Sequence, residues 1–197
     1  MTSIEAVDNL QRPGGGLSRK VYELNPAIKP YLDNTHLEEK RVTKLTESRK
    51  GTRLLMMGNE AIARGALEAG LSVAAGYPGT PSSEIIESLA RVSEDRNLYV
   101  EWSVNEKVSM EVAAAASFAE LRSICVLKQN GLHVASDFLL HLAGSGTRGG
   151  MLVIACDDPG ALSSVNEGDT RHFARMIEFP LLEPGNFQEA KDMTKWA

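Results

Sequence analysis

The sequence predicts an α/β fold in which a mostly parallel sheet carries helices on both faces. Two observations indicate this class: short apolar runs alternate with helical segments from residue 53 onward, and capping residues or glycines stand between them. The composition, with 43% hydrophobic and 24% charged residues, is typical of a globular protein. Strands that alternate with helices form a parallel sheet, because each helix carries the chain back to the edge where the strands begin.

Helices are expected where a capping signal precedes an amphipathic or alanine-rich stretch. The apolar run 54–57 leads into the first helix, which stops at Gly70, a residue that suits a helix end. Pro81 suits the first position of the next helix, with Thr80 as its cap, and Asn105 can cap the alanine-rich helix after it. The expected helices are residues 60–69, a helix from 81 onward, and residues 106–121, 133–143, 169–178 and 187–196.

Strands are expected in the apolar runs between these helices, at residues 72–75, 98–102, 123–127, 151–156 and 179–182. Two of these runs contain the cysteines, Cys125 and Cys156, which we interpret as small core hydrophobes because they lack the Cys-x-x-Cys spacing of zinc or redox sites. His133 and His141 lie about two helical turns apart, too far to share one metal ion. We therefore expect no metal site in this chain.

The first part of the chain has a different character. It contains the run Pro13-Gly14-Gly15-Gly16 and a polar stretch, residues 33–50, without a sustained apolar face. We expect residues 1–50 to form an extended or poorly ordered N-terminal arm and residues 51–197 to form one folded domain.

The charge and the apolar runs exclude several partners. The formal net charge of -5 provides no basic stripe of the kind that nucleic-acid binding usually requires. No apolar run approaches the ~20 residues of a membrane-spanning helix, and the first residues lack the features of a secretion signal. We expect a cytoplasmic protein without nucleic-acid or membrane partners.

One apparent nucleotide-binding motif is set aside. Residues 144–149, GSGTRG, fit the pattern G-x-G-x-x-G, but that pattern binds a dinucleotide only when a strand precedes it and a helix follows. Here the expected order is reversed, because a helix precedes the motif and a strand follows. We interpret the segment as a helix-to-strand connection, which also argues against a Rossmann dehydrogenase.

The candidate functional residues lie where expected strands end, since open α/β sheets bind ligands there. Thr80 offers a hydroxyl after Pro78-Gly79, where a ligand can approach the backbone, although glycine, threonine and proline are also ordinary turn residues. Glu106 opens the alanine-rich helix, where a carboxylate is often only a favourable partner of the helix dipole. If another domain covers Glu106, the group is removed from water and exchanges protons nearer neutrality. Both interpretations remain open on the residues alone.

Three motifs resemble the pyrimidine-binding domain of 2-oxoacid:ferredoxin oxidoreductases, and within that superfamily the alpha subunit of indolepyruvate ferredoxin oxidoreductases. They are residues 58–70 (GNEAIARGALEAG), 76–84 (GYPGTPSSE) and 101–107 (EWSVNEK). Residues 157–161 (DDPGA), 182–184 (LEP) and 188–192 (QEAKD) continue the similarity. The resemblance covers about residues 53–197.

This resemblance implies an enzyme that uses thiamine diphosphate with Mg²⁺, oxidatively decarboxylates an aryl 2-oxoacid to an acyl-CoA, and passes electrons through iron-sulfur clusters to ferredoxin. It implies that Glu106 hydrogen-bonds the aminopyrimidine ring and activates the cofactor, that Pro78 lines the cofactor, and that Thr80 and Arg171 bind the substrate carboxylate. Such a chain would work as a dimer or hetero-oligomer with a diphosphate-binding domain and an iron-sulfur module, which this sequence lacks.

Two hypotheses follow. Retention of Thr80 and Glu106 favours an enzyme component, inactive as this chain alone. A non-catalytic fragment or repurposed interaction module is favoured by the missing modules, by the chain's end inside an expected helix, and by departures from the family pattern. Those departures are Asn130, His133, Leu162 and Val165.

Overall fold

The computed structural model describes residues 44–161 and 164–197, and these described residues belong to one compact unit. Residues 1–43 of the expected arm therefore lie outside the described residues. Residues 44–50 are described: Leu45 lies in a short helical turn and is 2% exposed, packed into the core.

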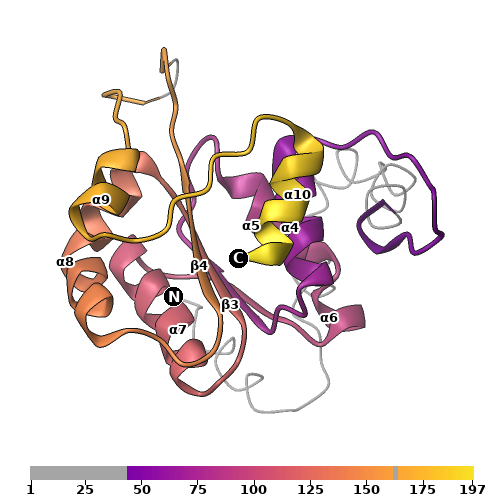
Figure 1. Cartoon of the computed structure of the whole chain (residues 1–197), viewed down its shortest axis with the longest axis horizontal. Coiled ribbons are helices and arrows are strands. Elements are labelled where there is room, and N and C mark those ends of the chain that lie inside the picture. The colour runs from indigo at the N-terminus through magenta and orange to yellow at the C-terminus, as the bar shows by residue number, and fades with distance from the viewer. Residues whose placement is uncertain (1–43, 162–163) are drawn as a thin grey trace, which may run out of the picture. The chain divides into compact units, whose positions relative to one another are not determined.

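The centre of the fold is a parallel sheet, of which β3 and β4 are labelled in Figure 1, and its strand order is β2-β1-β3-β4. Its strands are β1 (Val73–Gly76), β2 (Tyr99–Trp102), β3 (Ser123–Lys128) and β4 (Met151–Cys156). β1 pairs in parallel with both β2 and β3, and β3 pairs with β4 so that Lys128 stands opposite Cys156. The α/β class with a mostly parallel sheet is confirmed.

Helices cover both faces of this sheet, and alternate residues of β3 point to opposite sides. Ile124 and Val126 enter one core cluster, with α4 and α5, whereas Cys125 and Leu127 enter a second, with α7 and α8. The period of two along a strand accounts for this division. The helices are α4 (Gly58–Glu68), α5 (Ser83–Arg91), α6 (Ser93–Arg96), α7 (Glu106–Phe118), α8 (Gln129–Ser145), α9 (Arg171–Met176) and α10 (Phe187–Trp196).

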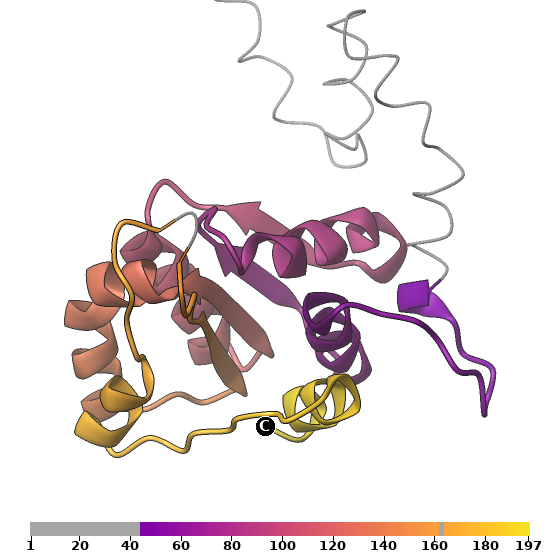
Figure 2. The same cartoon turned by 90° about the horizontal axis from the view of Figure 1, so that it is seen from above.

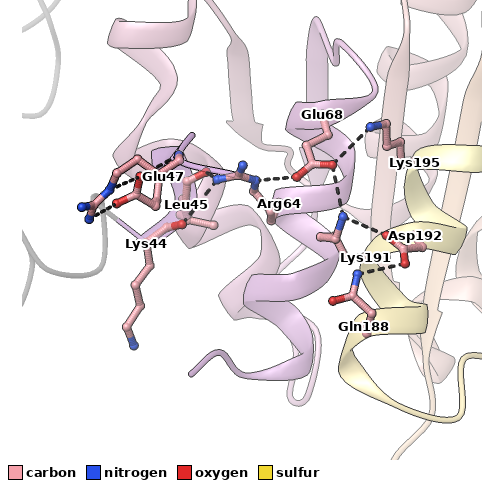
Figure 3. A network of polar contacts seen from close by, with 10 residues as sticks. Lys44, Leu45, Glu47, Arg64, Glu68, Gln188, Lys191, Asp192 and Lys195 are labelled. Carbon is pink, nitrogen blue, oxygen red and sulfur yellow. Dashed lines mark hydrogen bonds and ion pairs between the residues drawn. The ribbon is translucent and has the colours of Figure 1, made fainter. Parts of the chain in front are cut away.

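Helix α10 packs beside α4, as Figure 2 shows, and a polar network joins them (Figure 3). Glu68 accepts hydrogen bonds from Arg64 Nε at 2.8 Å, Lys191 Nζ at 3.2 Å and Lys195 Nζ at 3.3 Å. Arg64 Nη1 also donates to the Leu45 carbonyl at 2.7 Å. One carboxylate and one guanidinium thus connect three segments that lie far apart in the sequence.

Several expected elements differ from the structure. Residues 179–182 form no strand; they belong to an exposed connection between α9 and α10 and pair with no strand of the described chain. Helix α8 begins at Gln129, immediately after β3, and not at residue 133. Helix α5 begins at Ser83 with Ser82 at its N-cap, so neither Pro81 as first residue nor Thr80 as cap was correct.

Other expectations are confirmed. Helix α10 has the predicted bounds, and Asn105 caps α7 by accepting from the Val108 backbone N–H at 2.9 Å. The glycine-rich segment after α8 leads into β4, so it is the expected helix-to-strand connection. No helix in the described part of the chain is long and apolar enough to cross a bilayer.

Candidate functional site

The carboxyl ends of the four strands meet along one edge of the sheet, and the candidate residues lie in the segments that follow them. From β1 the chain moves to β2 on one side, whereas from β3 it moves to β4 on the other. The strand order therefore reverses between β1 and β3. In open α/β sheets, this is the place where ligands bind.

The turn after β1 is held by its own hydrogen bonds. The Gly79 carbonyl accepts from the backbone N–H groups of Ser82 at 2.8 Å and Ser83 at 3.1 Å, and the Gly79 N–H donates to Ser83 Oγ at 2.9 Å. From α4, Asn59 Nδ2 donates to the Pro81 carbonyl at 2.7 Å. Thr80 precedes a cis peptide bond to Pro81.

Thr80 and Pro78 are both exposed on this turn. The Thr80 hydroxyl has no hydrogen-bond partner among the described residues. The structure thus presents Thr80 on a backbone that is fixed from both sides, and it leaves the hydroxyl free for a ligand.

Glu106 is the first residue of α7 and is half-buried. Its side chain lies against the first turn of α8, since a Cβ at Gly131 would stand 2.7 Å from Glu106 Cγ and 3.2 Å from Oε1. Within the described residues its carboxylate has no hydrogen bond and no ion pair. A larger residue at position 131 would force the Glu106 side chain to shift from this position.

Buried acceptors without partners collect at the same edge. Gln129 Oε1, Asn130 Oδ1 and Asp157 Oδ1 are the buried side-chain polar atoms that find no hydrogen-bond partner within the part of the chain described. Buried polar groups are nearly always paired, so three unpaired acceptors at the ends of β3 and β4 are consistent with a site that receives donors from water or a ligand.

Lys128, the last residue of β3, connects the turns that follow β1 and β4. Its alkyl chain covers Gly79, where a Cβ would stand 2.9 Å from Lys128 Cδ. Its ammonium donates to Ser164 Oγ at 2.5 Å, and that hydroxyl donates to Asp158 Oδ2 at 2.8 Å. Sequence reasoning missed Lys128, although a lysine directly after a buried apolar strand was the available signal.

Arg171 lies apart from Thr80 and Glu106, in the segment that follows β4. Its Nε and Nη2 atoms donate to Asp169 at 2.8 and 2.7 Å, and Nη1 lies 3.5 Å from Glu183 Oε1. The hydrogen bonds from Arg171 lower the pKa of Asp169 to about 2. These residues, with Asp157 and Glu167, line an open cavity of about 530 Å³. The guanidinium is therefore already paired with acids of its own chain.

Three of the four positions that depart from the family pattern lie among the described residues. His133 is exposed, and its ring centroid lies 5.3 Å from that of Phe173 in α9. Val165 is 98% exposed. Leu162 lies outside the described residues. Asn130 is one of the residues with an unpaired buried oxygen, so a polar side chain occurs there without a structural partner.

The cysteines lie in the core as expected. Cys125 is fully buried in the cluster with α7 and α8. Cys156 is partly buried and packs against the cluster with α4 and α5. Burial raises the pKa of both thiols to about 12, and for Cys156 the charges of Asp157 and Glu84 add to this effect. Among the described residues, no three His, Cys, Asp or Glu side chains gather in a way that could hold a metal ion.

Comparison of the sequence with models of known protein families identifies the family of this chain. The family model described as "Pyruvate flavodoxin/ferredoxin oxidoreductase, thiamine diP-bdg" matches residues 64–197. The chain belongs to this family, and thus to the superfamily of 2-oxoacid:ferredoxin oxidoreductases, as the sequence motifs predicted.

Individual proteins of known name are also similar to this chain in sequence. The chain is 49% identical over 147 residues to indolepyruvate oxidoreductase subunit IorA of Thermococcus kodakarensis, and 45% identical over 150 residues to IorA of Archaeoglobus fulgidus. It is 34% identical over 82 residues, or 42% of its length, to 2-oxoglutarate synthase subunit KorA of Methanocaldococcus jannaschii. The IorA matches cover about three quarters of this chain, 75% and 74%, but the chain spans only 23% and 24% of those relatives.

A solved structure resembles the fold. The 2-oxoglutarate:ferredoxin oxidoreductase from Magnetococcus marinus, with 2-oxoglutarate, coenzyme A and succinyl-CoA bound, matches 90% of this chain and 34% of its own with a TM-score of 0.60. The sequence identity is 18%, so the similarity concerns the fold alone.

Proposed function

We propose that residues 51–197 are the pyrimidine-binding part of a thiamine diphosphate-dependent oxidoreductase. The enzyme oxidatively decarboxylates an aryl 2-oxoacid such as indolepyruvate to an acyl-CoA, with ferredoxin as electron acceptor. The observation that carries this proposal is the unpaired, half-buried carboxylate of Glu106 against Gly131, at the ligand-binding edge of a chain whose relatives are indolepyruvate oxidoreductase subunits.

The residues at this edge fit one end of the cofactor. Thiamine diphosphate, when bound, supplies a carbanion that attacks the substrate carbonyl and an electron sink for decarboxylation. Glu106 would accept a hydrogen bond from a protonated nitrogen of the aminopyrimidine ring, since its carboxylate has no competing partner in the described chain. Pro78 would line the ring from the turn after β1. Glu106 would therefore be the group with which the ring nitrogen exchanges its proton.

The substrate would be bound by residues of neighbouring turns. Thr80 would donate its free hydroxyl to the carboxylate of the 2-oxoacid. Arg171 would face the same carboxylate from the segment after β4, but it must first exchange its contacts with Asp169 and Glu183. Binding of the substrate by Arg171 would therefore require that these two ion pairs open.

We propose that the remaining requirements of the reaction are met outside residues 51–197. We propose that a further domain or subunit holds the diphosphate and its Mg²⁺, and that an iron-sulfur module transfers electrons to ferredoxin. Coenzyme A accepts the acyl group. The assembly would be a dimer or hetero-oligomer, as the family resemblance implies, and we propose that it is cytoplasmic.

Calorimetric titration tests this proposal. Thiamine diphosphate with Mg²⁺ is titrated into the purified chain, alone and mixed with the diphosphate-binding subunit from the same source. We expect binding only in the mixture, and at least a tenfold weaker affinity in Glu106→Gln, since a charge-assisted hydrogen bond contributes ~1.5–3 kcal/mol. Turnover of the assembled Glu106→Gln complex should fall much further than its affinity.

Two outcomes would contradict the proposal. Undiminished turnover in Glu106→Gln would remove the catalytic role of this residue. The absence of cofactor binding in every mixture would favour the alternative hypothesis, a non-catalytic module of the same fold.

A further inference from the structure

The carboxyl edge of the sheet contains one cation that the functions assigned so far do not use. Lys128 is half-buried at the end of β3, directly between the strand that leads to Thr80 and the strand that leads to Asp157. Its side chain covers Gly79, the neighbour of Thr80. Lys128 therefore contacts the turn that presents Thr80.

The ammonium of Lys128 is held in place but its charge is not neutralised by direct contact. An ammonium has three N–H donors. One donates to Ser164 Oγ at 2.5 Å, and this neutral hydroxyl separates Lys128 from Asp158. Lys128 forms no ion pair within the described part of the chain, so two donors are available to a ligand.

Arg171 contrasts with Lys128 in each respect. It is exposed, and it makes ion pairs with Asp169 at 2.7 Å and Glu183 at 3.5 Å. A bidentate arginine–carboxylate pair is among the stronger polar contacts in proteins, so a substrate would have to displace Asp169 before it could bind there. Lys128 requires no such exchange.

We propose that Lys128 binds the carboxylate of the 2-oxoacid substrate together with Thr80 and is the principal cation for that group. This inference rests on the proposed function, because it names a substrate-binding residue of the same site. Ser164 positions the ammonium by accepting a hydrogen bond from it, and Asp158 fixes the Ser164 hydroxyl in the orientation that allows this. The carboxylate then receives N–H donors from Lys128 and the O–H donor of Thr80.

The test uses the complete oxidoreductase complex assembled with the full subunit. In Lys128→Met, the KM for indolepyruvate should rise about 10- to 100-fold, the loss expected for a hydrogen bond between two charged groups. The KM for coenzyme A and the affinity for thiamine diphosphate should not change. A rise in the KM for coenzyme A instead would assign Lys128 to a phosphate of that substrate and overturn the proposal.

A neutral competitor separates charge recognition from deformation of the site. The methyl ketone 1-(indol-3-yl)propan-2-one has the indole ring and the carbonyl group but lacks the carboxylate. Its inhibition constant should be the same in the wild-type complex and in Lys128→Met. If this constant rises as much as the KM for indolepyruvate, Lys128 only supports the shape of the site and the inference is wrong.

Two further variants complete the design. Lys128→Arg keeps the charge and should raise the KM for indolepyruvate by less than about fivefold. Ser164→Ala keeps Lys128 but removes the connection between the two turns, so it should have a similarly small effect. A Ser164→Ala variant that reproduces the whole effect of Lys128→Met would show that Lys128 acts as a structural tie. If the Lys128→Met variant does not assemble, Lys128→Gln tests the loss of the same charge with a polar side chain.

The proposed function and this inference fail in different ways. A wild-type complex without thiamine diphosphate-dependent oxidation of any 2-oxoacid refutes the proposed function, and with it the ligand named here. An active wild-type complex in which Lys128→Met leaves the KM for indolepyruvate unchanged refutes only the role of Lys128.

Discussion

Substitution of Glu68 tests directly which contacts hold helix α10 against helix α4. Replacing Glu68 by glutamine keeps the shape of the side chain but removes the charge that Arg64, Lys191 and Lys195 share (Figure 3). The side chain of Glu68 is only 23% exposed, so solvent screens these contacts less than it would on an open surface. The variant should therefore destabilise the contact between α4 and α10.

The magnitude follows from the number and the exposure of the contacts. A fully exposed ion pair contributes ~0.2–1 kcal/mol, and glutamine can still accept one of the three hydrogen bonds. For three partly shielded contacts we expect Glu68→Gln to lower the free energy of unfolding by about 1–2 kcal/mol at pH 7. For a domain of this length, each kcal/mol lowers the melting temperature by about 2–4 °C.

The effect should depend on pH in a defined direction. Partial burial alone would raise the pKa of Glu68, but the hydrogen bonds from Arg64, Lys191 and Lys195 outweigh it and leave the pKa below its ordinary value. A carboxylate with a lowered folded-state pKa stabilises the protein above its unfolded-state pKa of about 4.3, and this contribution is lost as the pH falls through the folded-state pKa. The difference between wild type and Glu68→Gln should thus be greatest near neutrality and vanish in acid.

Urea unfolding followed by circular dichroism between pH 3 and pH 7 measures this difference. Glu87→Gln is the matched control, because Glu87 is 48% exposed and contacts a single partner, Arg91, at 3.8 Å. It should change the free energy of unfolding by less than about 0.5 kcal/mol. Equal stabilities of wild type and Glu68→Gln at pH 7, or a difference that persists unchanged in acid, would refute the reasoning.

Two other predictions concern buried residues. Leu45→Ala should lower the free energy of unfolding by about 2–4 kcal/mol, since Leu45 is 2% exposed in the core; a change below 0.5 kcal/mol in urea unfolding would mean that this turn does not pack there. At pH 8, a disulfide reagent such as dithionitrobenzoate should label neither Cys125 nor Cys156 in the folded chain and both in denaturant, because their pKa values of about 12 keep the thiols protonated. Rapid labelling of Cys125 before unfolding would contradict the buried position.

Local signals in the sequence were sufficient where the structure depends on neighbouring residues. The bounds of α10 and the cap of α7 were predicted correctly, because Asn186 and Asn105 each accept a hydrogen bond from a backbone N–H three residues later. The alternation of apolar runs and helices likewise predicted the parallel sheet. Each of these features is decided within a few residues of the chain.

Errors arose where tertiary contacts decide. Residues 179–182 are apolar enough for a strand, but a strand requires a partner, and none is available to them in the described chain. Thr80 is a good capping residue, yet Ser82 and Ser83 hydrogen-bond to the Gly79 carbonyl, and the helix begins only at Ser83. The position of Lys128 across Gly79 depends on two turns, around Gly79 and Ser164, that lie far apart in the sequence, and no local pattern reports their contact.

The hydrogen-bonded turn around Gly79 affects how fast and how tightly a ligand could bind. A loop that becomes ordered only on binding opposes association through the conformational entropy that it loses. In this turn Asn59, Ser82 and Ser83 already fix the backbone, so that entropy is lost during folding and not during association. Thr80 is therefore preorganised. A ligand bound at this edge would therefore lose little free energy to the ordering of this turn.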